Sequence, residues 1–206
     1  MTKIVQSKYK ISRRLGESLW GNAKDPFLKR NYGPGQHGSA NAGGKRKTVH
    51  GVQLQAKQKL KGYYNMTEKQ FRKFYAEAAR KKGNAAENLV GLLERRLDAV
   101  VYRLNLAPTI FAARQLVSHK HVLVNGKTTN IPSFLVREGD EISLKPKSKE
   151  MVICVESVQK MERSIPSYLS FEEHEMKGKF IRTPVLADIP YPVVMEPHFT
   201  VEFYSK

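Results

Sequence analysis

The chain has 206 residues, of which 40% are hydrophobic, and a formal net charge of +17 at pH 7. These values predict one or two domains with modest cores and exclude a membrane span, because no apolar run approaches the ~20 residues that a bilayer requires. The positive charge predicts a polyanionic partner, either nucleic acid or an anionic membrane surface, and the single cysteine excludes a disulfide within the chain.

Residues 1–45 are predicted to form an extended basic arm that orders against its partner, since they show little hydrophobic periodicity. Cations here are interspersed with aromatic residues instead of lining an amphipathic helix, which favours nucleic acid over a membrane surface. The N-terminus lacks the apolar segment of a secretory signal, and its acid-poor composition leaves a transit peptide open. Candidate RNA-binding cations in and just after this arm are Lys8, Lys10, Arg13, Arg14, Lys29, Arg30, Lys45, Arg46 and Lys47.

Residues 33–38, GPGQHG, match the dinucleotide-binding pattern G-x-G-x-x-G. We reject that match because the fingerprint needs a strand before it and a helix after it, and neither is predicted here. A glycine-rich turn beside cations can instead hold phosphates with its backbone N–H groups, although a flexible linker is the alternative. The candidates in this turn are Tyr32, Gly33, Gly35, Gln36 and His37.

Residues 46–92 are predicted to form a helical RNA-binding domain. One helix covers Val52 to Leu60, and a capping box at Thr67 to Gln70 begins another. In that second helix, Phe71, Phe74, Tyr75 and Ala78 recur at helical spacing, which favours a core stripe over a base-stacking platform. Arg80 to Lys82 complement the helix dipole or meet RNA, and a further helix begins at Ala85. The RNA-binding candidates are Gln53, Lys57, Lys61 and Arg72.

Residues 93–158 are predicted to form a module of two helices and a small hairpin sheet. Leu93, Leu97, Val100, Val101 and Leu104 form the apolar stripe of the first helix, and Thr109 caps a second helix, in which Leu116 is buried. Asn125-Gly126 predicts a hairpin turn after the strand 122–124, and residues 141–144 form another strand. The RNA-binding candidates are Arg96, Arg103, Arg114, Gln115, Ser118, His119, Lys120, Asn125 and Lys127.

Arg96 and Arg103 lie on the side of their helix away from the apolar stripe, where they either meet RNA or pair with Asp98 or Glu94. Arg114 has no acidic neighbour at helical spacing. Cys154 falls in a strand-like run, residues 152–155, as a small buried side chain. Residues 159–206 are rich in proline and mildly acidic, end in a strand-like run at 199–204, and favour a structural or protein-facing role.

No catalytic set or metal site is predicted. His119 and His121 are close in sequence, but neither cysteine nor carboxylate stands at metal-ligand spacing around them. We therefore expect no enzyme activity, no cofactor and no small-molecule substrate.

RLDAVVYRL followed by ARQLVSHKHVLVNGK resembles the RNA-binding module of the small-subunit ribosomal protein numbered four, written S-four. Such modules also occur in RNA-modifying enzymes and translational regulators, which are the alternative function. Beyond the module, YGPGQHG, GVQLQAKQKLKGYY, residues 68–104 and the closing VEFYSK resemble the bacterial-type family in order, from end to end. No room remains for an appended catalytic domain.

This resemblance implies an α+β fold: a basic arm, a mainly helical domain of residues 46–92 completed by 159–206, and the inserted module of two helices packed on an antiparallel hairpin sheet. It implies a structural component of the small ribosomal subunit. Such a protein nucleates assembly at a multi-helix junction in the 5′ domain of the ribosomal RNA and contributes to the messenger entry region and translational accuracy. The implied partners are that RNA, messenger RNA, and the small-subunit proteins numbered five and three.

The implied location is a cytoplasmic bacterial-type ribosome, with an organellar ribosome left open, and no membrane. Some family members bind zinc through an N-terminal cysteine cluster. This chain has no cysteine before Cys154, so the zinc form does not carry over. Tyr9, Trp20 and Phe27 are expected to help hold the arm instead.

Overall fold

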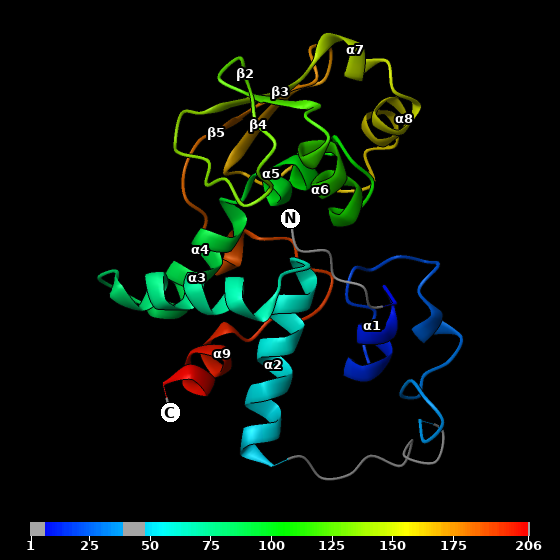
Figure 1. Cartoon of the computed structure of the whole chain (residues 1–206), viewed down its shortest axis with the longest axis vertical. Coiled ribbons are helices and arrows are strands. Elements are labelled where there is room, and N and C mark those ends of the chain that lie inside the picture. The colour runs from blue at the N-terminus through cyan, green and yellow to red at the C-terminus, as the bar shows by residue number, and fades with distance from the viewer. Residues whose placement is uncertain (1–6, 39–47, 206) are drawn as a thin grey trace. The chain divides into compact units, whose positions relative to one another are not determined.

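The computed structural model describes residues 7–38 and 48–205, which divide into two compact units (Figure 1). One unit combines the residues up to Ala86 with those from Tyr191 onward, and the other comprises Glu87–Pro190. The fold is α+β, as predicted.

The first unit is helical. Its elements are α1 (Lys10–Leu15), the short 3-10 helix η1 (Pro26–Leu28), α2 (Val49–Tyr63), α3 (Glu68–Arg80) and α9 (Pro197–Tyr204). Thr67 caps α3 as predicted, because its side chain accepts a hydrogen bond from the backbone N–H of Gln70. Phe71, Phe74 and Ala78 are buried, which confirms the core stripe.

The described part of the N-terminal arm is not extended. Leu15, Leu19 and Trp20 are buried, and the indole Nε1 of Trp20 donates to the carbonyl of Tyr63 at 3.1 Å. Tyr9 packs edge-on against Trp20, so the expected aromatic anchor is confirmed for these two residues. Hydrophobic burial against α2 supplies the order that sequence periodicity did not reveal.

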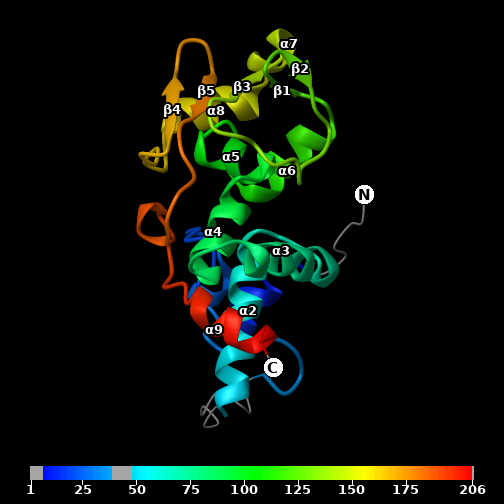
Figure 2. The same ribbon diagram turned by 90° about the vertical axis from the view of Figure 1, so that its left-hand side faces the viewer.

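The second unit packs helices against an antiparallel sheet. Its elements are α5 (Leu97–Arg103), α6 (Ile110–Ser118), β1 (Val122–Val124), β2 (Lys127–Thr128), β3 (Glu141–Leu144), α7 (Pro146–Lys149), α8 (Val152–Lys160), β4 (Leu169–Glu172), β5 (Lys177–Phe180) and η2 (Leu186–Asp188). The strand order is β2-β1-β3-β5-β4. Figures 1 and 2 both show α5 and α6 on one side of this sheet.

The sheet is larger than the predicted hairpin. β3 pairs with β5, so that Ile142 lies opposite Gly178, and β5 pairs with β4. Residues 169–180 were predicted to complete the helical domain, but the structure places them in this sheet. A Cβ at Gly178 would lie 2.5 Å from a methyl carbon of Leu104, so any other residue at this position would require the Leu104 side chain to move.

The helix predicted from the apolar stripe of Leu93 to Leu104 is interrupted. α4 (Ala85–Glu94) begins in the first unit and ends in the second, and α5 starts after Arg96. The segment 132–136 causes the break, because its carbonyls accept from the N–H groups of Leu97 and Asp98, and Val136 donates to the carbonyl of Arg95. These bonds replace those of a continuous helix.

Two predicted strands are helices. Residues 152–155 lie in α8, where Cys154, Ser157 and Val158 are buried at helical spacing. Residues 199–204 lie in α9, which starts at Pro197 and buries Thr200. Tertiary packing overrides the β propensity of Val, Ile and Phe in both segments. Cys154 is buried as expected.

Candidate RNA-binding surface

Arg96 and Arg103 are not exposed, which corrects their assignment to RNA. Arg96 has no exposed surface and donates two hydrogen bonds to Asp98, at 3.0 and 2.6 Å. Arg103 is 3% exposed and donates to both carboxylate oxygens of Glu94, at 3.1 and 2.8 Å. Tyr168 donates to Glu94 as well, at 2.8 Å. The pairing alternative is therefore confirmed, but inside the core.

Arg114 lies half-buried on α6, with its guanidinium 3.9 Å from Asp98. Burial lowers the pKa of Arg114, and the negative charge of Asp98 works in the opposite direction. Arg114 has no acidic neighbour at helical spacing, as predicted, but Asp98 approaches it from another helix, α5. Gln115 is exposed, and the hydroxyl of Ser118 donates to the carbonyl of Arg114 at 2.7 Å. Ser118 thus bonds within its own helix.

The residues that follow α6 stay accessible. His119 and Lys120 are exposed, and Lys120 has the positive φ of 65° that reverses the chain before β1. At the other end of β1, Asn125 and Gly126 form the predicted turn with φ of 49° and 74°. Lys127 is exposed on β2.

Asn125 maintains this turn through its own amide. Its Nδ2 donates to Asp140 at 2.8 Å, and its Oδ1 accepts from the N–H of Glu141 at 2.9 Å. Both polar ends of this exposed side chain therefore take part in hydrogen bonds within the protein.

The predicted contacts on α2 are also internal. Lys57 is 5% exposed and pairs with Glu68 at 2.6 Å, and Lys61 pairs with the same carboxylate at 3.0 Å. Gln53 is buried and donates to Glu202 at 2.9 Å. A buried ammonium group needs a paired charge, and Glu68 of α3 supplies it. These side chains of α2 therefore bind α2 to α3 and to the C-terminal segment.

Within the arm, Arg13 binds its own chain. Its guanidinium donates to the carbonyls of Tyr32 and Gly33 at 3.2 and 3.1 Å and lies 4.9 Å from the ring centroid of Tyr32. Gly38 donates to Gly35 and passes so close to Gly33 that a Cβ would overlap its carbonyl. The dinucleotide-binding fingerprint requires a strand before its first glycine. Residues 30–32 form no strand, which supports the rejection of that match.

The exposed candidates of the arm are Lys8, Lys10, Arg14, Lys29, Arg30, Gly35, Gln36 and His37. Lys45, Arg46 and Lys47 lie outside the described residues.

Sequence reasoning missed two sets of cations. On α3, Lys69 and Lys73 are exposed together with the predicted Arg72, away from the buried Phe71 stripe. The helical spacing of the buried stripe could have predicted their exposure, because residues between its positions lie on the opposite face of the helix. The second set follows β3, where lysines alternate at 145, 147 and 149.

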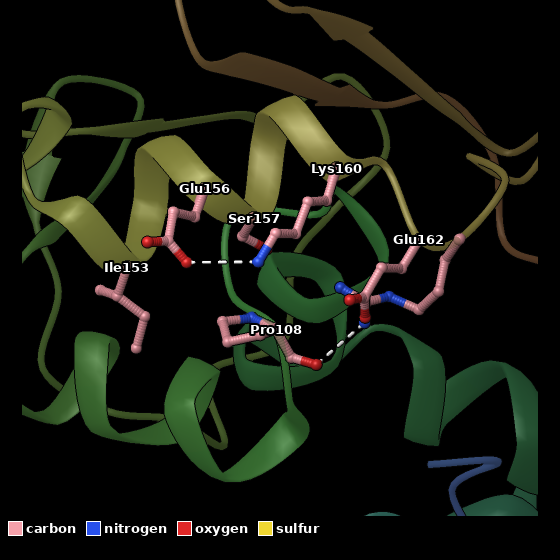
Figure 3. Close-up of a pocket in the computed structure, with 7 residues that line it drawn as sticks. Pro108, Ile153, Glu156, Ser157, Lys160 and Glu162 are labelled. Atoms are coloured by element: carbon pink, nitrogen blue, oxygen red, sulfur yellow. Dashed lines mark hydrogen bonds and ion pairs between the residues drawn. The ribbon is translucent and has the colours of Figure 1, made fainter. Parts of the chain in front are cut away.

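A small hollow between α8 and the turn before α6 does not form a ligand site. It holds about 70 Å³ and is lined by Pro108, Ile153, Glu156, Ser157, Lys160, Glu162 and Arg163 (Figure 3). Ligand pockets typically measure ~300–1,000 Å³. Three of the charged side chains at its rim have partners, since Lys160 pairs with Glu156 and Arg163 donates to the carbonyl of Pro108.

The chain matches two family descriptions in sequence. Residues 3–94 match the ribosomal protein S4/S9 N-terminal domain, and residues 95–142 match the S4 domain. It is 58% identical to the small ribosomal subunit protein uS4 of Gluconobacter oxydans, and equally to those of a Ruegeria species and Acidiphilium cryptum. Each comparison covers 100% of both chains.

The chain belongs to the uS4 family. It is a structural, RNA-binding component of a bacterial-type small ribosomal subunit and not an enzyme, which confirms the S-four resemblance. The exposed α6 and β2 candidates fall within the S4 domain, whereas α7 lies beyond both matched domains.

Two further observations describe this uS4 chain. In residues 7–38 and 48–205, no group of three His, Cys, Asp or Glu side chains could hold a metal ion. No helix in these residues has the length and apolar content needed to cross a bilayer.

Proposed function

We propose that this uS4 protein binds folded small-subunit ribosomal RNA mainly through exposed lysines and arginines that contact phosphates. The observation that carries the proposal is the sorting of cations in the S4 domain: Arg96 and Arg103 are neutralised in the core, while His119, Lys120 and Lys127 remain on the surface. Side chains cannot read base edges in the deep major groove of A-form RNA, so shape governs recognition.

The RNA-contact residues that we propose are Lys8, Lys10, Arg14, Lys29, Arg30, Gln36, His37, Arg72, Arg114, Gln115, His119, Lys120 and Lys127. Their target is the multi-helix junction in the 5′ domain of the RNA, where binding nucleates assembly of the subunit. In the assembled subunit of a cytoplasmic ribosome, the protein contacts the proteins numbered five and three. It also contributes to the messenger entry region and to translational accuracy.

Binding measurements on three RNAs test this function: the folded 5′-domain junction, a scrambled sequence that keeps the fold, and an unstructured RNA of equal length. The two folded RNAs should bind more tightly than the unstructured one. Affinity for them should fall steeply with salt, with a log–log slope of up to ~0.9 for each phosphate contact on a duplex. Equal affinity for all three RNAs would reduce the interaction to charge attraction and contradict the proposal.

A further inference from the structure

α7 lies outside the two domains that the family models match. The S4 domain match ends at residue 142, and α7 covers Pro146–Lys149. The short segment 145–149 carries three lysines, of which Lys147 is exposed and Lys145 and Lys149 are half-buried. Pro146 at the start of the helix fixes the backbone there.

Three contacts fix α7 against the residues that end α6. β1 and β3 pair with Val122 opposite Leu144, which brings His121 beside Lys145. The N–H of Lys145 donates to the carbonyl of His121 at 2.9 Å, and the His121 Nδ1 lies 2.9 Å from the hydroxyl oxygen of Ser148. Ser148 is only 4% exposed, so α7 is positioned by packing as well as by hydrogen bonds. α7 follows β3 directly (Figure 1).

The contacts between α7 and the end of α6 concentrate positive charge. Lys120 lies in the turn after α6, and Lys145, Lys147 and Lys149 come from the segment after β3. In the described part of the chain, none of these four lysines forms an ion pair.

Two carboxylates on the elements that flank α7 are already paired. Glu141 pairs with Lys177 at 3.0 Å, and Glu156 pairs with Lys160 at 3.4 Å. The exposed Glu150 offsets only one of the four charges. A cluster of ammonium groups with so little acidic compensation attracts anions strongly.

We infer that Lys120, Lys145, Lys147 and Lys149 form a phosphate-binding surface that extends the RNA contact beyond the S4 domain. The inference rests on the proposed function and names a further part of the same RNA-contact surface. Its ligand is the sugar–phosphate backbone of the folded RNA, because lysine binds phosphate as a flexible point charge and does not select a base. Lys120 joins this surface to the S4 domain.

The test uses the full chain and a transcript of the 5′ domain of small-subunit ribosomal RNA. The double variant Lys147→Gln/Lys149→Gln removes two charges from α7. Lys160→Gln/Lys179→Gln removes the same number from α8 and β5, where both side chains are exposed, and serves as the matched control. Thermal melts of both variants establish that they fold, and Lys147→Gln alone replaces the double variant if that one does not.

The α7 variant should bind about tenfold or more weakly at 0.1 M salt, and its log–log salt slope should be smaller by about one to two. The control should stay within about twofold of the parent. Hydroxyl-radical footprinting should show that the α7 variant loses ribose protection at one contiguous RNA segment and keeps the rest.

Equal RNA affinity and equal salt slope for the two double variants would overturn the inference. A footprint in which the α7 variant weakens ribose protection uniformly along the whole RNA would also overturn it. Either result leaves the proposed function intact as long as the parent still prefers folded RNA. If the parent itself does not distinguish folded from unstructured RNA, the proposed function fails.

Discussion

The carboxylate of Glu94 accepts hydrogen bonds from Arg103 and Tyr168, and Glu94 is completely buried. Arg103 gains a further acceptor in the carbonyl of Pro190 at 3.1 Å. Removing one partner of such a pair leaves a buried charge without compensation, which costs more than the pair contributes. Arg103 therefore acts on stability.

Arg103→Ala should lower the free energy of unfolding by about 3–5 kcal/mol, because Glu94 would remain buried without its cation. Urea denaturation measures this change. Arg137→Ala removes an exposed arginine from the same unit, and its free energy of unfolding should stay within about 0.5 kcal/mol of the parent. A stable Arg103→Ala that binds RNA weakly would show that Arg103 meets RNA after all.

Arg114→Ala should cost about 1–2 kcal/mol of RNA affinity, the range for a hydrogen bond to a charged group, with little change in the melting temperature. Asp98 keeps its two bonds from Arg96, so no carboxylate loses its partner. RNA titrations at fixed salt, together with thermal melts, measure both effects. Arg114→Lys separates charge from geometry. If Arg114→Ala leaves the RNA affinity unchanged and lowers the melting temperature, Arg114 only stabilises the fold through its ion pair with Asp98.

The spacing of apolar residues predicted that Arg96 and Arg103 lie away from the Leu97 stripe, but it could not predict their burial. Segments that are distant in sequence bond to the residues beside them: residues 132–136 to the backbone of Arg95, Leu97 and Asp98, and Tyr168 to Glu94. An exposed helical face and a face covered by a distant segment have the same local pattern. His119, Lys120 and Lys127 were predicted as accessible and are exposed, since they occupy turns and an edge strand.

At the scale of elements, Glu68 connects three helices. It accepts from Lys57 and Lys61 of α2, lies itself at the start of α3, and accepts from the hydroxyl of Tyr204 of α9 at 2.6 Å. Burial alone would raise the pKa of Glu68, but the hydrogen bonds from Lys57, Tyr204 and Lys61 outweigh it and lower the pKa to about 2.

The contribution of Glu68 to stability should depend on pH in a defined window. Because its folded pKa lies below the unfolded value, the contribution is complete above about pH 4.5 and is lost as the pH falls towards about 2. The difference in free energy of unfolding between the parent and Glu68→Gln should therefore shrink over this window. Since the side chain is 47% exposed, screening limits the change to at most about 1 kcal/mol.

Denaturation at several pH values measures this difference. Tyr204→Phe removes one of the three donors and should reduce the pH-dependent part without abolishing it. A difference between the parent and Glu68→Gln that stays constant from pH 4.5 to 2 would show that Glu68 is not held as a carboxylate by its neighbours.

Elements with local chemical signals were predictable, and elements defined by distant partners were not. Thr67 and Thr109 cap helices, and Asn125-Gly126 forms the hairpin turn, because each acts on residues within a few positions. α8 and α9 were predicted as strands because their β-branched and aromatic residues carry a local strand preference. They form helices because packing against the rest of each unit outweighs this local preference.

At the scale of the whole molecule, the N-terminal arm is ordered by packing, since Leu19 is fully buried and Trp20 bonds to Tyr63. His37 and His50 are the only histidines in the first 50 residues, and no thiolate accompanies them. A tetrahedral structural zinc site needs four suitable ligands.

Treatment with a chelator should therefore change neither the melting temperature nor the RNA affinity. Elemental analysis of the purified protein, combined with melts and titrations before and after chelation, checks this expectation. Stoichiometric zinc together with a loss of binding after chelation would contradict it.

The domain boundaries depended on pairing that sequence does not reveal. The predicted module ended at residue 158, whereas the second unit continues to Pro190 because β5 pairs with β3. Thirty-odd residues separate these strands, so no hairpin signal links them, and their proline-rich flanks favoured a separate assignment.

The interruption of the first unit by the second sets an order of folding during synthesis. α9 supplies Phe203 and Tyr204 to contacts with Lys57, Phe71 and Tyr75, but it is translated only after the second unit, roughly a hundred residues later. At ~5–20 residues per second, α2 and α3 wait about 5–20 s for this partner. The second unit receives all its strands without interruption, so the nascent chain can complete its inserted unit before the unit that surrounds it.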